Sequence, residues 1–191
     1  MSITARLMSW RITLNTKTKP MQKNILYAGA FLTLVLLQIF LIDNISLSVY
    51  FHPLIYVAFI ILLPLDTKPI WMVLLSALLG LTIDVMTGMG GINIIATTAT
   101  GFLRPFVLKM VTGHAMGTDA SDTSLHRLPE KNFQWYIIAM VVLHSGIYFM
   151  MESLSLMHIL HTLLRLIVSD IATVMFIYYF VKLFIEKILN R

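Results

Sequence analysis

Long apolar stretches dominate this sequence and constrain its fold more than any other feature. Six of them carry almost no charge, and they fall near 25–42, 47–65, 70–87, 91–109, 135–151 and 160–184. About 20 apolar residues in a helix, rising 1.5 Å each, cross the roughly 30 Å hydrocarbon core of a bilayer. The sequence therefore predicts an all-α, polytopic membrane protein, built as a bundle of six transmembrane helices.

The overall composition excludes an ordinary soluble domain. Hydrophobic residues make up 58% of the 191 residues and charged residues only 12%, whereas roughly a quarter of a soluble domain is charged. The chain has no cysteine, so it has no disulfide, thiol nucleophile or cysteine metal site. Its formal charge of +5 does not indicate nucleic-acid binding, because no soluble part is large enough to form a binding face.

The positions of the basic residues predict the orientation. With the N-terminus inside, 12 of the 14 lysines and arginines lie in cytoplasmic segments, and the other two, Arg104 and Arg165, lie within apolar stretches. The outer loops then carry only two charged residues, Asp43 and Glu152. Membrane proteins concentrate Lys and Arg on the cytoplasmic side, so we expect both termini to be cytoplasmic.

The chain divides into a tail and a membrane domain. Residues 1–24 are basic and are predicted to form a cytoplasmic tail, either disordered or lying on the anionic inner leaflet; Met21 is an alternative start. Residues 25–191 form the predicted membrane domain. Its one long loop, near 110–134, is rich in small polar residues, which is typical of a mobile cytoplasmic linker.

The stretch from Gly80 to Arg104 predicts a tightly packed helical hairpin. Gly80, Asp84 and Gly88 recur every four residues and so share one ridge of the first helix. Small and polar residues line one arc of the second helix, and they are Asn93, Thr97, Thr100, Gly101 and Arg104. Small residues let membrane helices approach closely, so both ridges are expected to face protein rather than lipid.

Two charged residues of this hairpin allow several interpretations. Asp84 is expected to anchor an interhelical hydrogen bond or a partner, to cap the glycine turn, or to form part of a ligand or ion site. Arg104 is expected to extend its guanidinium to the cytoplasmic interface, as long basic side chains do near helix ends. Direct pairing of Asp84 with Arg104 is not expected, because they lie near opposite ends of the hairpin.

Four further polar residues are predicted to lie inside the bundle. Asp170 is too deep in its stretch to face lipid, Ser169 and Thr173 flank it, and His144 is a candidate hydrogen-bond partner for it. Arg165 is expected to reach the outer interface, and Gln38 adds an interior amide.

No enzyme or metal motif is visible. The sequence has no HExxH, GxSxG or Walker A pattern and no acidic pair at metal spacing. Of the six histidines only His158 and His161 are close, and two ligands alone make a weak metal site. We therefore predict no catalytic residues, no metal site and no cofactor.

The hairpin and the segment before it carry a family resemblance. GLTIDVMTGMGGINIIATTATGFLRPFVL, preceded by ILLPLDTKPIWMVLLSALL, resembles the MreD family of rod-shape-determining proteins, in its Bacteroidetes-type form. The family hallmark is G-x-x-x-D-x-x-x-G followed by another glycine, matched here by Gly80, Asp84, Gly88 and Gly91. The resemblance covers about residues 21–190. One departure is Met89-Gly90-Gly91, where many members have a proline-containing turn.

The resemblance implies a non-catalytic subunit of the cell-elongation machinery in the bacterial inner membrane. Such proteins bind MreC, a single-span protein with a periplasmic coiled coil. Through it they are linked to MreB filaments, to the RodA glycosyltransferase and to a class B penicillin-binding transpeptidase. The ridge residues Gly80, Asp84 and Gly88 would then pack the hairpin and shape a groove for a partner helix, together with Gly91, Thr97, Gly101 and Arg104.

A second function stays open. The family is thought to share its fold with the substrate-binding subunits of energy-coupling-factor vitamin transporters. In that reading a small vitamin would lie near Asp170, His144 and Gln38. The Ala-x-x-x-Ala docking pattern expected in the first helix of such a subunit is not evident.

Overall fold

The computed structural model describes residues 24–42, 52–65, 67–113, 128–153 and 159–184, and within these ranges it contains helices but no strand. An apolar helix, Asn24–Phe40, runs into the π-helical turn η1, Gln38–Ile42. Two short elements follow, the 3₁₀ turn η2, Ile55–Val57, and α2, Ala58–Leu62. The long helices are α3 Pro69–Thr87, α4 Ile92–Thr112, α5 Glu130–Ser153 and α6 Ile159–Phe184.

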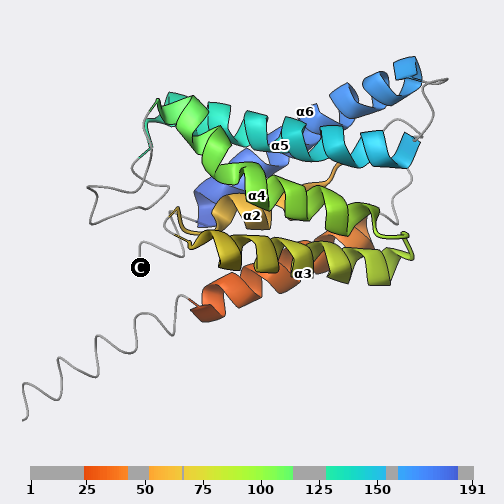
Figure 1. The fold of residues 1–191 in the computed structure, drawn as a ribbon, viewed down its shortest axis with the longest axis horizontal. Helices are drawn as coiled ribbons and strands as arrows, with labels where there is room; N and C mark the ends of the chain where they lie inside the picture. Colours follow the sequence, from red (N-terminus) through yellow and green to blue (C-terminus); the bar gives the residue numbers. More distant parts are fainter. Residues whose placement is uncertain (1–23, 43–51, 66, 114–127, 154–158, 185–191) are drawn as a thin grey trace, which may run out of the picture.

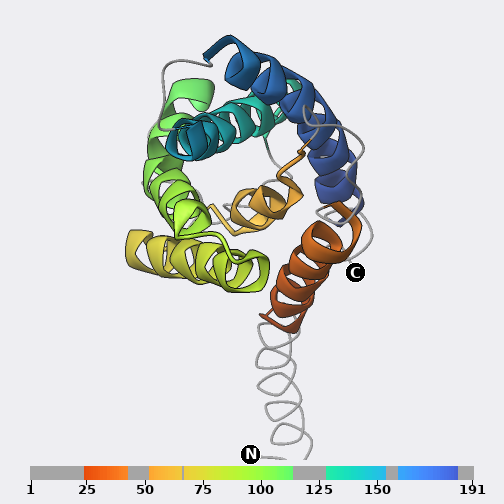
Figure 2. The same ribbon diagram turned by 90° about the vertical axis from the view of Figure 1, so that its right-hand side faces the viewer.

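The long helices surround α2. Seen end on in Figure 2, α3, α4, α5 and α6 follow one another around a ring, and the Asn24–Phe40 helix completes it. Tyr27 packs against Phe184 of α6 with ring centroids 6.1 Å apart, and η1 contacts α3, so the first helix joins both sides of the ring. The core of the protein is therefore centred on α2.

The segment around α2 is buried along its whole length. Every residue from Leu54 to Leu63 is at most 4% exposed. The helical part spans only residues 55–62, and Pro64 prevents its continuation. The residue before a proline is pushed out of the helical region, and Leu63 accordingly has φ −55° and ψ 143°. We call η2 and α2 together the buried half-helix.

The predicted six spans are confirmed in part. Four helices, α3 to α6, are long and apolar enough to cross a membrane, and they match the predicted ranges closely. The prediction of a complete helix at 47–65 is wrong for the described part, because its helix covers residues 55–62 only and has no lipid-facing side. The Asn24–Phe40 helix is apolar but shorter than the other four.

Two predicted segments lie largely outside the described residues. These are the N-terminal tail and the centre of the loop near 110–134. At the edges of that loop, α4 continues to Thr112 and α5 begins at Glu130, so the predicted loop was too long at both ends.

The α3–α4 turn depends on two glycines with positive φ. Gly88 ends α3 at φ 72° and donates its N–H to the Asp84 carbonyl at 2.9 Å; Gly91 precedes α4 at φ 94°. Residues other than glycine rarely adopt this backbone conformation. The predicted tight glycine turn is confirmed.

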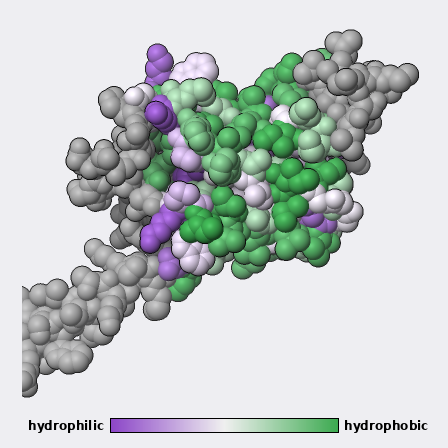
Figure 3. Space-filling model, in the orientation of Figure 1, coloured by the Kyte–Doolittle hydropathy of each residue, from purple (hydrophilic) through white to green (hydrophobic). Residues whose placement is uncertain are grey.

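The outer surface of the ring is apolar. Hydrophobic side chains cover most of the visible face in Figure 3, and the hydrophilic ones gather toward its two ends (Figures 1 and 3). Exposed large residues come from all the long helices, for example Val85 at 73%, Phe102 at 60% and Met150 at 70%. Such a belt suits hydrocarbon rather than water.

Candidate functional site

The candidate site consists of the polar groups around the two ends of the buried half-helix. A helix leaves its first N–H groups and its last carbonyls unpaired. In a bilayer, water is not available to satisfy them, so other protein groups must do so. Of the polar residues singled out in the sequence, Gln38 and Arg104 lie at these two ends, and Asp84 lies at the neighbouring α3–α4 hairpin.

Arg104 closes the C-terminal end. Its guanidinium donates to the carbonyl of Pro64 at 3.1 Å, to that of Leu63, and to that of Ile61 at 3.5 Å. Its Nε donates to the Tyr136 hydroxyl at 2.7 Å. A cation at this position also complements the negative end of the helix dipole.

The expectation that Arg104 extends to the membrane interface is therefore wrong. The side chain is 1% exposed and points into the ring. The physical reason is that the end of the interrupted half-helix presents several carbonyl groups to α4, and a guanidinium with five donors can bind all of them, which no neutral side chain can do.

Neutral side chains close the N-terminal end. Gln38 accepts from the Ile55 N–H at 2.9 Å and donates to the Pro53 carbonyl at 3.3 Å. The Leu54 N–H donates to Thr173 Oγ1 at 3.1 Å. Gln38 is 1% exposed, so its predicted interior position is confirmed.

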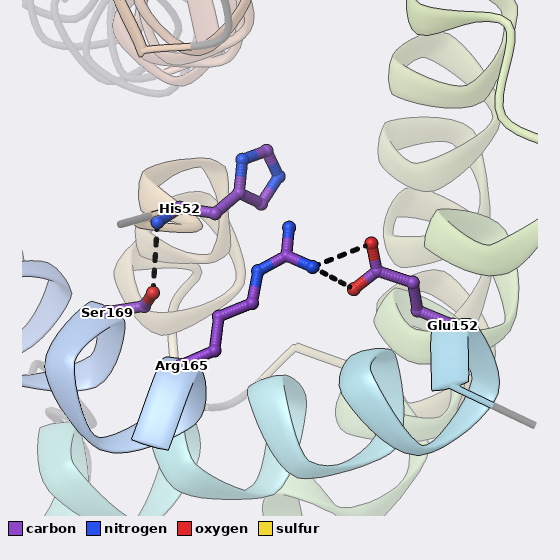
Figure 4. A network of polar contacts seen from close by, with 4 residues as sticks. All are labelled: His52, Glu152, Arg165 and Ser169. Carbon is purple, nitrogen blue, oxygen red and sulfur yellow. Dashed lines mark hydrogen bonds and ion pairs between the residues drawn. The ribbon is translucent and has the colours of Figure 1, made fainter. Parts of the chain in front are cut away.

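One more backbone group is held beside this end. The His52 N–H donates to Ser169 Oγ at 3.0 Å, as drawn in Figure 4. Ser169 and Thr173, which are one turn apart on α6, thus both contact the chain that leads into the half-helix.

Asp84 caps the N-terminus of α4. Its Oδ1 accepts from the backbone N–H of Asn93 at 3.1 Å and from Asn93 Nδ2 at 2.9 Å, and its Oδ2 accepts from the Ile94 N–H at 2.8 Å. The carboxylate is therefore both an interhelical anchor and a cap. It is 6% exposed, and negative charge is favoured at a helix N-terminus.

The same network reaches the half-helix. The Tyr56 hydroxyl donates to Asn93 Oδ1 at 2.6 Å, so Asn93 joins Tyr56 to Asp84. All contacts of Asp84 lie at the turn end of the hairpin, whereas Arg104 binds near the other end. The expectation that these two residues do not pair is confirmed.

The two small-residue ridges face each other inside the hairpin. A Cβ added at Gly80 would lie 2.5 Å from Ile94 Cα and 2.6 Å from the Asn93 carbonyl oxygen, and it would also meet Thr97 Oγ1. A Cβ added at Gly101 would lie 2.8 Å from Ser76 Cβ. The prediction that the ridges face protein is confirmed for Gly80 and Asp84 and for the ridge of α4, whereas Gly88 is exposed at the turn. The close approach of α3 and α4 requires glycine at positions 80 and 101.

Asp170 points inward as predicted, but its partner is not His144. Ser145 Oγ donates to Asp170 Oδ2 at 2.8 Å, and Asp170 is 6% exposed. His144 is fully buried and lies edge-on to Tyr56, with ring centroids 5.2 Å apart. Its two ring nitrogens have no hydrogen-bond partner among the described residues, so the predicted pairing is wrong.

Arg165 forms an ion pair. One guanidinium nitrogen lies 3.0 Å from both carboxylate oxygens of Glu152, as Figure 4 shows, and the guanidinium lies 5.2 Å from the centre of the Phe149 ring. The side chains of Arg165 and Glu152 are 27% and 26% exposed. The expectation that Arg165 simply extends to the outer interface missed this pairing.

A cavity of about 300 Å³ adjoins the N-terminal end of the half-helix. This volume is at the lower end of the range for small-molecule sites. His144 and Asp170, which were predicted to lie near a ligand, are not among its lining residues. Those residues are Gln38, Ile39, His52, Leu54, Tyr56, Ile83, Met86, Thr87, Met89, Asn93 and Tyr148.

In the part of the chain that the structure describes, no three His, Asp or Glu side chains come close enough to hold a metal ion. Gln38, Asp84 and Arg104 instead bind backbone groups of the protein itself. The sequence analysis did not identify Tyr136, Tyr56 and Ser145 as parts of this network. A tyrosine inside an apolar stretch is the available signal, because its buried hydroxyl needs a partner.

Comparison of the chain with models of known protein families, with curated proteins and with solved structures found no match.

Proposed function

We propose that this chain is a non-catalytic scaffold of the bacterial inner membrane, similar to MreD, which binds MreC and helps to organise peptidoglycan synthesis during cell elongation. The observation that carries the proposal is the α3–α4 hairpin. The residues that match the family hallmark have distinct physical roles there: Gly80 permits close helix contact, Asp84 caps α4, and Gly88 and Gly91 form the turn.

The hydrogen-bond partners of the buried polar side chains support a scaffold rather than an enzyme. Arg104, Gln38 and Asp84 bind backbone groups of the protein itself. Side chains so engaged hold helices at fixed positions, which is what a scaffold requires.

The hairpin would act on a partner helix through its shape. Gly80, Thr97 and Gly101 are buried between α3 and α4, so they do not touch the partner. The exposed faces of these helices are apolar, and in lipid their association with a helix depends on complementary packing rather than on a hydrophobic driving force. The hairpin residues would therefore support MreC binding by fixing the spacing of α3 and α4.

The proposed topology has six crossings and two cytoplasmic termini. Its support is the distribution of Lys and Arg, 12 of which fall in the segments assigned to the cytoplasm. The segment around the buried half-helix would make the second crossing. MreB, RodA and a class B penicillin-binding transpeptidase would be reached indirectly, through MreC.

A cross-linked pull-down from native membranes, analysed by mass spectrometry, tests the proposal. We expect a single-span protein with a large periplasmic coiled coil, accompanied by peptidoglycan synthases. Asp84→Leu should reduce its recovery, and Thr82→Leu, on another face of α3, should not. Recovery of an ATPase pair with a polytopic coupling subunit, or undiminished recovery with folded Asp84→Leu, would contradict the proposal.

A second candidate is a substrate-binding subunit of a vitamin transporter. The observation that favours it is the 300 Å³ cavity with its polar lining. It predicts that one member of a vitamin panel raises the melting temperature of the purified protein, and a panel without any effect would count against it.

A further inference from the structure

The cavity beside the half-helix has an unusual lining for a space inside a membrane bundle. Its described lining residues include amide and hydroxyl groups and one imidazole, that of His52, but no carboxylate, ammonium or guanidinium. Transfer of a charged ligand into such a space would cost the ligand its hydration without an opposite charge in return. The lining therefore favours an uncharged molecule.

Asn93 is the best-placed polar group on this lining. It is 3% exposed and is held by hydrogen bonds to Asp84 and Tyr56. An asparagine amide has two N–H groups and two lone pairs. Nδ2 gives one N–H to Asp84, and Oδ1 accepts one bond from Tyr56. One donor and one acceptor are left on a side chain whose orientation is already fixed.

Aromatic walls complete the site. His52 and Tyr148 lie nearly parallel, at an interplanar angle of 25° and a centroid distance of 6.0 Å, and Tyr56 also lines the cavity. Aromatic faces favour flat rings in offset stacks or edge contacts. Ile83, Met86 and Met89 supply apolar contacts, and methionine adapts to varied shapes.

We propose that this cavity binds a small, uncharged aromatic molecule with a carboxamide or lactam edge. Its carbonyl accepts from Asn93 Nδ2, its N–H donates to Asn93 Oδ1, and its ring lies against the aromatic walls. The site goes beyond the scaffold function and does not depend on it.

Benzamide and benzoate test this directly, because they are nearly identical in shape and differ in charge and in the N–H donors. Saturation-transfer NMR is recorded with the full-length protein in nanodiscs, and empty nanodiscs correct for partition into lipid. We expect benzamide to bind at least ten-fold more tightly than benzoate.

The variant that tests the position is Thr87→Trp. Thr87 lines the cavity, is exposed and bonds only its own helix, to the Ile83 carbonyl at 2.8 Å, so a bulky side chain there narrows the cavity without breaking the network. Thr82→Trp is the matched control, since Thr82 bonds the Leu78 carbonyl in the same way and lies outside the lining. We expect benzamide binding to fall at least five-fold in Thr87→Trp only.

Three results would overturn the proposal: no benzamide signal above empty nanodiscs, equal binding of benzoate, or equal binding by Thr87→Trp. The pull-down of the scaffold partner is read separately. If the unmodified protein recovers its partner normally but does not bind benzamide, the cavity site alone is rejected.

Discussion

The two ends of the buried half-helix solve the same problem with different chemistry. At the C-terminal end, one arginine from α4 binds the carbonyl groups of Ile61, Leu63 and Pro64 and a tyrosine hydroxyl. At the N-terminal end, backbone N–H groups need acceptors. Gln38 from the first helix accepts from the Ile55 N–H, and Thr173 from α6 accepts from the Leu54 N–H. The hydrogen bonds at the C-terminal end come from one charged side chain, whereas those at the N-terminal end come from neutral side chains of two helices.

The difference teaches where this bundle is vulnerable and where it is free to bind something. At the arginine end the hydrogen bonds depend on one residue, so a single substitution should strongly reduce the stability of the fold. The neutral end spreads the hydrogen bonds, leaves a cavity beside it, and should tolerate single losses. A ligand site is compatible with the second arrangement because no net charge has to be buried with it.

Arg104→Met should have the largest effect. It takes the guanidinium from the buried Leu63 carbonyl and from the buried Tyr136 hydroxyl, and we expect a loss of about 3–5 kcal/mol in the free energy of unfolding. Arg104→Lys keeps the charge with fewer donors and should lose about half as much. Unfolding in mixed micelles measures both, and a loss below about 1 kcal/mol for Arg104→Met would remove the distinction between the ends.

Gly80→Ala tests whether the spacing of α3 and α4 supports both ends. The added Cβ meets backbone atoms at 2.5 and 2.6 Å, so α4, which carries Asn93 and Arg104, has to move. We expect a destabilisation of about 1–3 kcal/mol. Gly146→Ala in α5 is the control, since its Cβ would meet nothing within 4 Å, and it should be neutral or stabilise by up to about 1 kcal/mol. Equal effects of the two variants would contradict close packing.

Thr173→Val removes one hydrogen bond from the neutral end. The Leu54 N–H then loses its acceptor, and we expect a loss of about 1–2 kcal/mol. Thr98→Val is the matched control: Thr98 Oγ1 is buried without a partner in the described part of the chain, so valine there should change stability by less than about 0.5 kcal/mol. Thermal unfolding of both variants in the same detergent gives the comparison, and a larger loss for Thr98→Val would refute it.

Arg165→Met should have the smallest effect. Its ion pair with Glu152 is about a quarter exposed on both sides, and such pairs contribute at most about 1 kcal/mol. The two arginines within the predicted apolar stretches are thus a matched pair with different burial. If Arg165→Met were as destabilising as Arg104→Met, burial at the half-helix would not explain the role of Arg104.

The helices and the hairpin could be predicted because they depend on local patterns. Apolar length predicts α3 to α6, and the four-residue spacing of Gly80, Asp84 and Gly88 predicts a ridge that faces protein. The glycines of the turn follow from their position between two apolar helices. These features depend on residues that are close in the sequence, so they can be predicted from the sequence alone.

The half-helix and its partners could not be predicted in the same way. The run 47–65 has enough apolar residues for a span, and only the burial of residues 54–63 on all sides distinguishes it from one. Arg104 binds residues about 40 positions earlier, and Thr173 binds Leu54 across 119 positions. Such contacts depend on how the helices are arranged around the ring. The prolines at 53 and 64 are the one local sign of an interrupted helix.

The most direct test of the central claim is a solid-state NMR measurement of what surrounds the Arg104 guanidinium in a bilayer. Arginine is labelled with ¹⁵N and proline carbonyls with ¹³C, and the signal lost in Arg104→Lys identifies residue 104. Since Nη1 lies 3.1 Å from the Pro64 oxygen and a carbonyl bond is about 1.23 Å long, we predict strong ¹⁵N–¹³C dephasing and no ¹⁵N–³¹P dephasing from lipid phosphate. Strong dephasing by phosphate without any by the carbonyl would place the guanidinium in the headgroups and contradict the account.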